Sequence, residues 1–198
     1  MARITALAAL ALALALPAVA QTPPEPRTDV PALIKEAKAD PAIAAILSDT
    51  TRPFESRLRD EPRYTALILK AADAKPGERV LDVGSGGGYL ALLFSSLVGG
   101  SSGAGGHVDI HNTPGWINQF PSMDPAFQKQ RITRPNVGWL TTRWTDIDGP
   151  PASYDLVVMG QVYHDIPLEG ENPEIVNARL FAMLEPGGRV VIEDHDAI

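Results

Sequence analysis

Hydrophobic positions in the first third of the chain recur at helical spacing. Between Pro31 and Leu47 the apolar residues follow a helical period, and Pro41 should divide this stretch into two short helices. Residues 50–63 are rich in Arg, Asp and Pro and predict a loop with one helical turn, whereas residues 64–74 repeat the helical pattern. The sequence therefore predicts a helical extension that precedes any strand.

From Arg79 onward the pattern changes to short apolar runs that alternate with helical segments. The short runs predict strands at residues 79–83, 107–111, 137–144, 154–159 and 189–193. The segments between them predict helices at residues 89–98, 124–132 and 173–184. Alternating strands and helices form parallel βαβ units, in which helices cover both faces of one open sheet. The predicted fold class is therefore α/β.

The first twenty residues have the layout of a cleaved secretory signal. Arg3 gives a basic start, Ile4–Leu16 is an apolar run, and Ala18–Ala20 places small residues where a signal peptidase reads them. The apolar run is shorter than the roughly 20 residues that a membrane-spanning helix needs. We therefore expect cleavage after Ala20, export to the periplasm or the medium, and no membrane association of the mature chain.

Composition narrows the classes of partner. The formal net charge of −7 argues against nucleic-acid binding through a broad basic surface. The chain has no cysteine, which excludes a disulfide framework, a thiol nucleophile and a cysteine-based zinc site. We expect a small-molecule partner and three segments: a signal peptide (1–20), a Pro-rich leader with the helical extension (21–75), and one α/β domain (76–198).

The most informative stretch is the glycine loop after the first predicted strand. Gly84, Gly86 and Gly88 allow sharp turns and close approach of a ligand, and the following helix points its N-terminal amides at the same place. Asp82 adds a carboxylate, which suits a ligand with an ammonium group better than a pyrophosphate. Residues 86–91 also match the dinucleotide string G-x-G-x-x-A, but a fingerprint that begins at the strand end would place Tyr89 at its third position. A glycine-rich turn without a ligand is the third reading.

Three segments together resemble class I S-adenosylmethionine-dependent methyltransferases. Residues 75–88 resemble the first motif of that family, residues 154–158 its fourth strand, and residues 184–192 its final turn and fifth strand. The signal peptide, the segment from Arg52 to Arg63 and the run 163–165 resemble more narrowly a group of exported predicted methyltransferases. The resemblance implies a Rossmann-like, mainly parallel sheet of about five strands in the order 3-2-1-4-5.

The resemblance also implies a cofactor site for S-adenosylmethionine. Its glycine loop would hold the methionine end through Asp82, Gly84, Ser85, Gly86 and Gly88. Asn112 best matches the acidic residue that usually binds the ribose, with Asp109 as the alternative if the strand ends earlier. Asp146 is the nearest carboxylate to the usual adenine-binding position. No Asp or Glu stands at the position that Asn112 matches, which is a departure from the family pattern.

Acceptor chemistry would lie at the carboxyl ends of strands four and five. His164 is the natural base there, because histidine exchanges protons near neutral pH. Asp165 would orient His164 or hold an acceptor ammonium, and Tyr163 would wall the pocket; the other reading is that these residues only tie down the loop. We expect no metal site, since residues 193–196 and the histidines lack a recognisable ligand spacing.

The family fold continues past strand five with a helix and two further strands. We therefore expect a reading frame truncated after strand five, with an exposed apolar edge at residues 190–192 through which two copies could pair. The function indicated is a methyltransferase acting on a small molecule. The alternatives are an exported, non-catalytic nucleoside-binding protein on the same scaffold, and an NAD-type oxidoreductase.

Overall fold

The computed structural model describes residues 29–99 and 105–195 of the chain. The predicted signal peptide, residues 1–20, lies outside these residues, as does the first part of the leader. Within the described ranges no helix is both long enough and apolar enough to cross a membrane.

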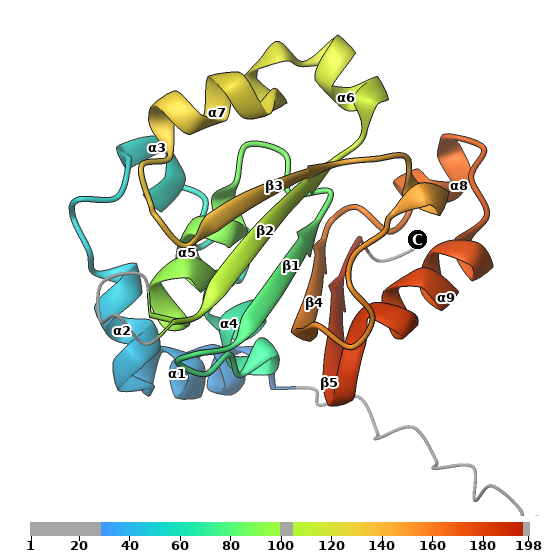
Figure 1. The fold of residues 1–198 in the computed structure, drawn as a ribbon. Helices are drawn as coiled ribbons and strands as arrows, with labels where there is room; N and C mark the ends of the chain where they lie inside the picture. The colour runs from blue at the N-terminus through green and yellow to red at the C-terminus, as the bar shows by residue number, and fades with distance from the viewer. Residues whose placement is uncertain (1–28, 100–104, 196–198) are drawn as a thin grey trace, which may run out of the picture.

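Five parallel strands form one sheet in the order β3-β2-β1-β4-β5 (Figure 1). The strands are β1 (Arg79–Val83), β2 (His107–Asn112), β3 (Val137–Thr141), β4 (Tyr154–Gly160) and β5 (Leu184–Glu193). All four neighbouring pairs are parallel, so the five carboxyl ends lie at one edge of the sheet. The Rossmann-like fold class and the strand order are therefore confirmed.

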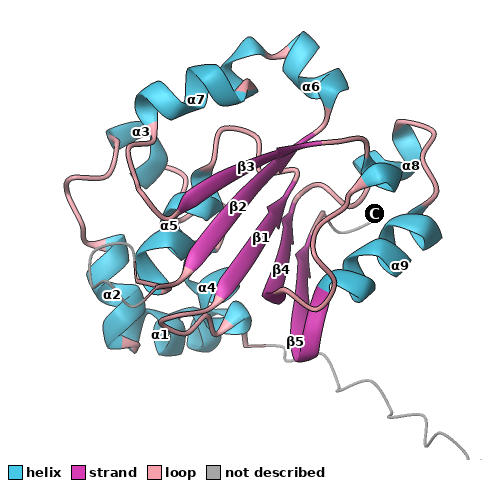
Figure 2. Ribbon diagram, in the orientation of Figure 1, coloured by secondary structure: helices cyan, strands magenta, loops and turns pink. Residues whose placement is uncertain are grey.

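Helices cover both faces of the sheet (Figure 2). Val80 and Leu156 belong to a core shared with the helical extension, α5 and the residue that follows α7, whereas Leu81 and Val157 belong to a second core shared with η2, α8 and α9. This alternation follows from the period of two along a strand. In the α/β domain these elements are α5 (Tyr89–Leu97), α7 (Pro125–Arg131), η2 (Trp144–Asp146), α8 (Asp165–Leu168) and α9 (Pro173–Met183).

The helical extension consists of α1 (Val30–Ala39), α2 (Pro41–Leu47), α3 (Phe54–Arg57) and α4 (Thr65–Ala72). The predicted division at Pro41 is confirmed, because Pro41 begins α2 and the Asp40 carboxylate caps this helix by accepting from the Ala42 N–H (3.0 Å). Arg52 donates two hydrogen bonds to Asp60 (2.9 and 2.7 Å), and the Tyr89 hydroxyl donates a third (2.7 Å). This network attaches the extension to the start of α5.

The predicted turn at residues 185–188 interrupts the start of β5. Leu184 pairs with Tyr154, but the next pair is Arg189 with Leu156, so four residues of β5 bulge out of the ladder. Arg189 then donates to the backbone oxygens of Ala72 (2.7 Å) and Asp73 (2.9 Å) and to Glu78. The guanidinium thus fastens β5 to the end of the helical extension.

Two parts of the prediction need correction. The third strand ends at Thr141 rather than Trp144, because Trp144 turns into η2, is fully buried in the second core and donates its indole N–H to Glu169 (2.9 Å). The segments α6 (Pro114–Gln119), η1 (Pro121–Met123), η2 and α8 were not predicted. Each is at most six residues long, too short for a period to show.

Candidate functional site

The loop between β1 and α5 turns through three glycines with left-handed backbones. Gly84, Gly86 and Gly88 have φ values of +64°, +61° and +82°. A Cβ atom at Gly84 would lie 2.3 Å from the Val162 side chain, whereas one at Gly86 would meet only Met123, at 3.7 Å. Gly87 faces open space, with nothing within 4 Å of a Cβ placed there. The loop is therefore closely packed at its start and open at its tip.

Buried side chains from β2 and α7 hold Gly86 in place. The Asn112 side chain accepts from the Gly86 N–H (2.8 Å) and donates to the Gly86 carbonyl (2.9 Å), and Gln128 donates to the same carbonyl (2.7 Å). Asn112 and Gln128 are each only 2% exposed. Asn112, predicted to contact a ribose, thus shapes the loop with both ends of its amide; the ribose contact stays a prediction.

Asp82 lies beneath the loop and is 1% exposed. Burial raises the pKa of its carboxyl to about 6, against the opposing effect of hydrogen bonds from Ser85 and from the Ala91 N–H. The Ser85 hydroxyl donates to Asp82 at 2.5 Å. Both predicted residues therefore act within the loop, where Asp82 ties the end of β1 to the first turn of α5.

His111 on β2 is fully buried beside the same loop. Burial lowers the pKa of its imidazole to about 4, so the ring is neutral at physiological pH. Asp109 lies in mid-strand, because β2 continues to Asn112, and it accepts hydrogen bonds from Tyr154 (2.8 Å) and Arg79 (3.3 Å). The alternative that placed Asp109 at the end of this strand was wrong.

The first turn of α5 carries unused donors. Gly88, the N-cap, offers no side chain to bind the first amides of the helix. In the part of the chain that is described, the N–H groups of Gly87, Tyr89 and Leu90 donate no hydrogen bond. Free amides at a helix N-terminus attract negatively charged groups such as a carboxylate.

Unpaired polar atoms also lie at the carboxyl ends of β4 and β5. Arg63 donates to the Gly160 carbonyl (3.2 Å), and its guanidinium is 3.6 Å from the Glu193 carboxylate, too far for a hydrogen bond. Arg63 Nε and Glu193 Oε2 are buried and have no hydrogen-bond partner. A Cβ at Gly160 would lie 2.6 Å from the Leu90 side chain, so the end of β4 packs against α5. Arg63 and Glu193 thus form an ion pair in which one buried donor atom and one buried acceptor atom make no hydrogen bond.

His164 lies beyond β4 and contacts the end of β5. Its Nδ1 is 2.7 Å from Asp194 Oδ1, and its backbone N–H donates to Asp194 Oδ2 (3.0 Å). Partial burial disfavours the charged Asp194 carboxylate, but hydrogen bonds from His195 and His164 outweigh this effect and lower its pKa. Asp194 is thus the carboxylate that orients His164, whereas Asp165, the predicted one, is 3.4 Å from Nε2.

The remaining predicted residues are placed as follows. Burial raises the pKa of Asp165, which stands at the start of α8. Tyr163 is half-buried, and its hydroxyl accepts from the Asn177 amide (2.9 Å). Asp146 is exposed at the end of η2, and its carboxylate has no hydrogen bond within the described ranges. The predicted site residues therefore form two groups. One lies in the glycine loop around Asp82, and the other surrounds His164 at the ends of β4 and β5.

Three side chains could in principle hold a metal ion. One ligand atom each from His164, Asp194 and His195 lies within 4.8 Å of the others. Asp194, however, already accepts three hydrogen bonds, from His164 Nδ1 and from the N–H groups of His164 and His195. This arrangement matches a hydrogen-bonded dyad better than a ligand set, and the absence of a metal stays a prediction.

Sequence reasoning missed the roles of Gln128, Asp194 and Glu193. Gln128 sits in a helix with no motif around it, and only the packing of α7 on the loop brings it to Gly86. Glu193 is the last residue of β5 and Asp194 follows it directly, so their position at a strand end was the available signal.

Comparison with known proteins places the chain among methyltransferases. Residues 54–198 match the family model described as a methyltransferase domain. The chain is 34% identical over 138 residues to protein-L-isoaspartate O-methyltransferase 1 of Arabidopsis thaliana, covering 66% of this chain and 53% of that protein. It is 24% identical over 132 residues to a ubiquinone/menaquinone biosynthesis C-methyltransferase of Vibrio vulnificus, covering 65% and 45%. The chain thus spans about half the length of the curated relatives that it matches.

Solved structures agree at the level of the fold. A SAM-dependent methyltransferase from Aquifex aeolicus superposes with a TM-score of 0.52 at 22% identity, covering 82% of this chain and 71% of that one. A protein-L-isoaspartate O-methyltransferase gives a TM-score of 0.54 at 19% identity, covering 81% and 52%.

Proposed function

The chain belongs to the methyltransferase-domain family, and from that premise we propose that it transfers a methyl group from S-adenosylmethionine to a small-molecule acceptor. The relatives named above include an O-methyltransferase and a C-methyltransferase, so the family leaves the acceptor open.

One observation carries the cofactor assignment. Unpaired donors and an unpaired acceptor surround the same end of the sheet: the α5 amides, Arg63 Nε and Glu193 Oε2. Buried polar atoms without partners are uncommon in folded proteins, and each costs free energy unless a ligand or water satisfies it. The amino-acid end of S-adenosylmethionine carries a carboxylate and an ammonium group, which match these donors and this acceptor. A pyrophosphate would leave the Glu193 acceptor unmatched and place negative charge beside it.

When bound, S-adenosylmethionine supplies an electrophilic methyl group on a sulfonium. The glycine loop would hold the methionine end, while Arg63 and the first turn of α5 bind its carboxylate. His164 would take the proton from an oxygen or nitrogen acceptor, and Asp194 would fix the ring by its contact with Nδ1. Nε2 is then the atom that receives the proton.

The first experiment is calorimetric titration of the chain with S-adenosylhomocysteine and, separately, with NAD. We expect heat with the first ligand only. Gly86→Ala should weaken binding, while Gly170→Ala should not: both glycines have positive φ and room for a methyl group, but Gly170 lies after α8, away from the loop. Preference for NAD, or equal effects of the two substitutions, would contradict the proposed cofactor site.

An acceptor screen then tests turnover. Methyl transfer to at least one oxygen, nitrogen or carbon acceptor supports the enzyme, whereas binding without turnover across the screen favours the alternative of a non-catalytic nucleoside-binding protein. The fold alone does not separate the two.

We further propose that the protein is exported, a proposal supported by the basic, apolar and small-residue pattern of residues 1–20. Mass spectrometry of protein recovered from a periplasmic or culture-medium fraction should find an N-terminus at Gln21. A full-length chain confined to the cytosolic fraction would contradict it.

A further inference from the structure

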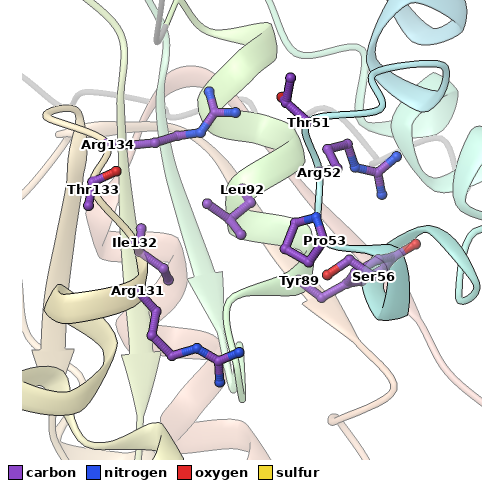
Figure 3. Close-up of a pocket in the computed structure, with 10 residues that line it drawn as sticks. All are labelled: Thr51, Arg52, Pro53, Ser56, Tyr89, Leu92, Arg131, Ile132, Thr133 and Arg134. Atoms are coloured by element: carbon purple, nitrogen blue, oxygen red, sulfur yellow. The ribbon is translucent and has the colours of Figure 1, made fainter.

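We propose that a cavity between the α3 region, α5 and the end of α7 binds a small organic dianion, with an acidic group at each end of a short apolar body (Figure 3). The cavity has a volume of about 210 Å³. Engineered cavities of about 150 Å³ already admit benzene. None of its lining residues belongs to the glycine loop or to the His164 group, so the inference goes beyond the proposed function.

The middle of the cavity is apolar. Leu92 of α5, Ile132 after α7 and Pro53 before α3 line it, and Leu92 and Ile132 lie near the centre of the group of side chains in Figure 3. Ile132 and Leu92 belong to or pack on the first core, which makes this part of the wall rigid. Such a wall suits the carbon chain of a ligand rather than a hydrated inorganic ion.

Two arginines without carboxylate partners lie at opposite ends of the same group (Figure 3). Over the part of the chain that the structure describes, neither Arg131 nor Arg134 has an acidic group within ion-pair distance. Asp49 is near enough to Arg134 for the guanidinium to help lower its pKa, but its carboxylate is engaged by Thr51. In contrast, Arg52 lines the cavity yet gives its guanidinium to Asp60.

Two hydroxyl groups also line the cavity. Ser56 and Thr133 line the cavity, and their hydroxyls make no hydrogen bond within the described residues. The Tyr89 hydroxyl is already bonded to Thr65 and Asp60, so it adds only its ring. The lining thus offers two guanidinium groups and two free hydroxyls to the acidic groups of a ligand, a combination that binds carboxylates well. The local positive charge stands out in a chain whose net charge is −7.

The test is calorimetric titration of the full chain with glutarate, a five-carbon dicarboxylate. Its neutral diamide, glutaramide, keeps the shape and removes the charges, and butyrate keeps one acid. We expect glutarate to bind, butyrate to bind at least about tenfold more weakly, and glutaramide not to bind, because charged hydrogen bonds supply the affinity. Inorganic phosphate should compete only weakly, since it reaches one end at a time.

Variants decide whether this cavity is responsible. Arg131→Gln and Arg134→Gln should each weaken glutarate binding about tenfold or more, while Arg179→Gln, at an exposed arginine of α9, should not. Leu92→Trp should block binding by filling the cavity with both arginines still present. No glutarate binding by the wild-type chain, equal binding of glutaramide, or indifference to both arginine substitutions would overturn the proposal. Circular dichroism of each variant verifies that it is folded.

Discussion

Two regions at the carboxyl edge of the sheet differ in how their polar atoms are used. At the ends of β1 and β2, Asn112 and Gln128 bond to Gly86, and Ser85 bonds to Asp82, so most buried groups satisfy one another. At the ends of β4 and β5, Arg63 Nε and Glu193 Oε2 have no partner. The first region is built to hold a loop in one shape, whereas the second retains capacity for a ligand. Substitutions of the side chains that hold the loop should therefore cost mainly stability, and substitutions in the second region should cost binding or turnover.

The largest difference between an effect on activity and an effect on stability is expected at His164. With an acceptor found by the screen, His164→Gln should lower turnover by about 10²–10⁴-fold, because general base catalysis contributes about that much. Its side chain is 42% exposed, so the free energy of unfolding should change by less than about 0.5 kcal/mol. Rate measurements and urea unfolding of the same preparation compare the two effects. Unchanged turnover in a folded variant would remove His164 from the mechanism and leave it as a loop anchor.

Arg63 should show the next largest effect. Arg63→Gln should weaken S-adenosylhomocysteine binding by about 10- to 100-fold through loss of charged hydrogen bonds. The loss of stability should stay near about 1 kcal/mol, since one bond to the Gly160 carbonyl is also removed. Calorimetry measures the first quantity, with Arg179→Gln as the surface control. A loss of stability with no loss of affinity would mean that Arg63 only holds the structure together, like the side chains at the ends of β1 and β2.

A substitution of Asn112 tests whether the region at the ends of β1 and β2 supports stability. Asn112→Ala leaves the part-buried Gly86 N–H without an acceptor and should lower the free energy of unfolding by about 1–3 kcal/mol. Asn118→Ala, at an exposed position of α6, should change it little. Urea denaturation of both variants gives the comparison. If the two variants were equally stable, the hydrogen bonds to Gly86 would not support the loop.

The smallest expected effect is a change in the pH dependence of stability, caused by the buried groups at the ends of β1 and β2. Burial raises the pKa of Asp82 from 3.8 to about 6, so its contribution to stability falls as pH rises through that window. Burial lowers the pKa of His111 from 6.5 to about 4, so its contribution is lost as pH falls through that window. The two effects oppose each other in the wild-type chain. Asp82→Asn removes the contribution of Asp82, so the free energy of unfolding should fall more steeply as the pH is lowered.

Urea unfolding at several pH values measures this slope. Between about pH 6.5 and pH 5 the difference from wild type should be on the order of 1 kcal/mol. Asp148→Asn, at an exposed carboxylate, serves as the control and should leave the slope unchanged. A slope identical to that of the wild type would mean that Asp82 is not the buried acid described above.

The sheet could be predicted from sequence because its strands are short apolar runs between glycine and proline turns. Residues 79–83 and 154–159 are buried on both faces, so hydrophobicity alone marks them. The glycine loop could also be predicted from sequence, since three glycines at alternate positions directly after a strand indicate a tight, ligand-binding turn. The role of Gln128 in holding that loop could not be predicted, because Gln128 reaches Gly86 only through the packing of α7. Contacts between elements follow from three-dimensional packing, which no local pattern encodes.

The hydrogen bonds from Arg189 to Ala72 and Glu78 link chain segments that are 111 to 117 residues apart. Contacts of such high sequence separation form late, because long loops must close first. During synthesis the helical extension and β1 emerge well before β5 does. Until β5 pairs with β4, the end of α4 and Glu78 lack the guanidinium that fastens them. A ribosome-bound chain stopped before residue 189 should therefore show a protease-sensitive boundary near residue 75, and a longer nascent chain should lose it.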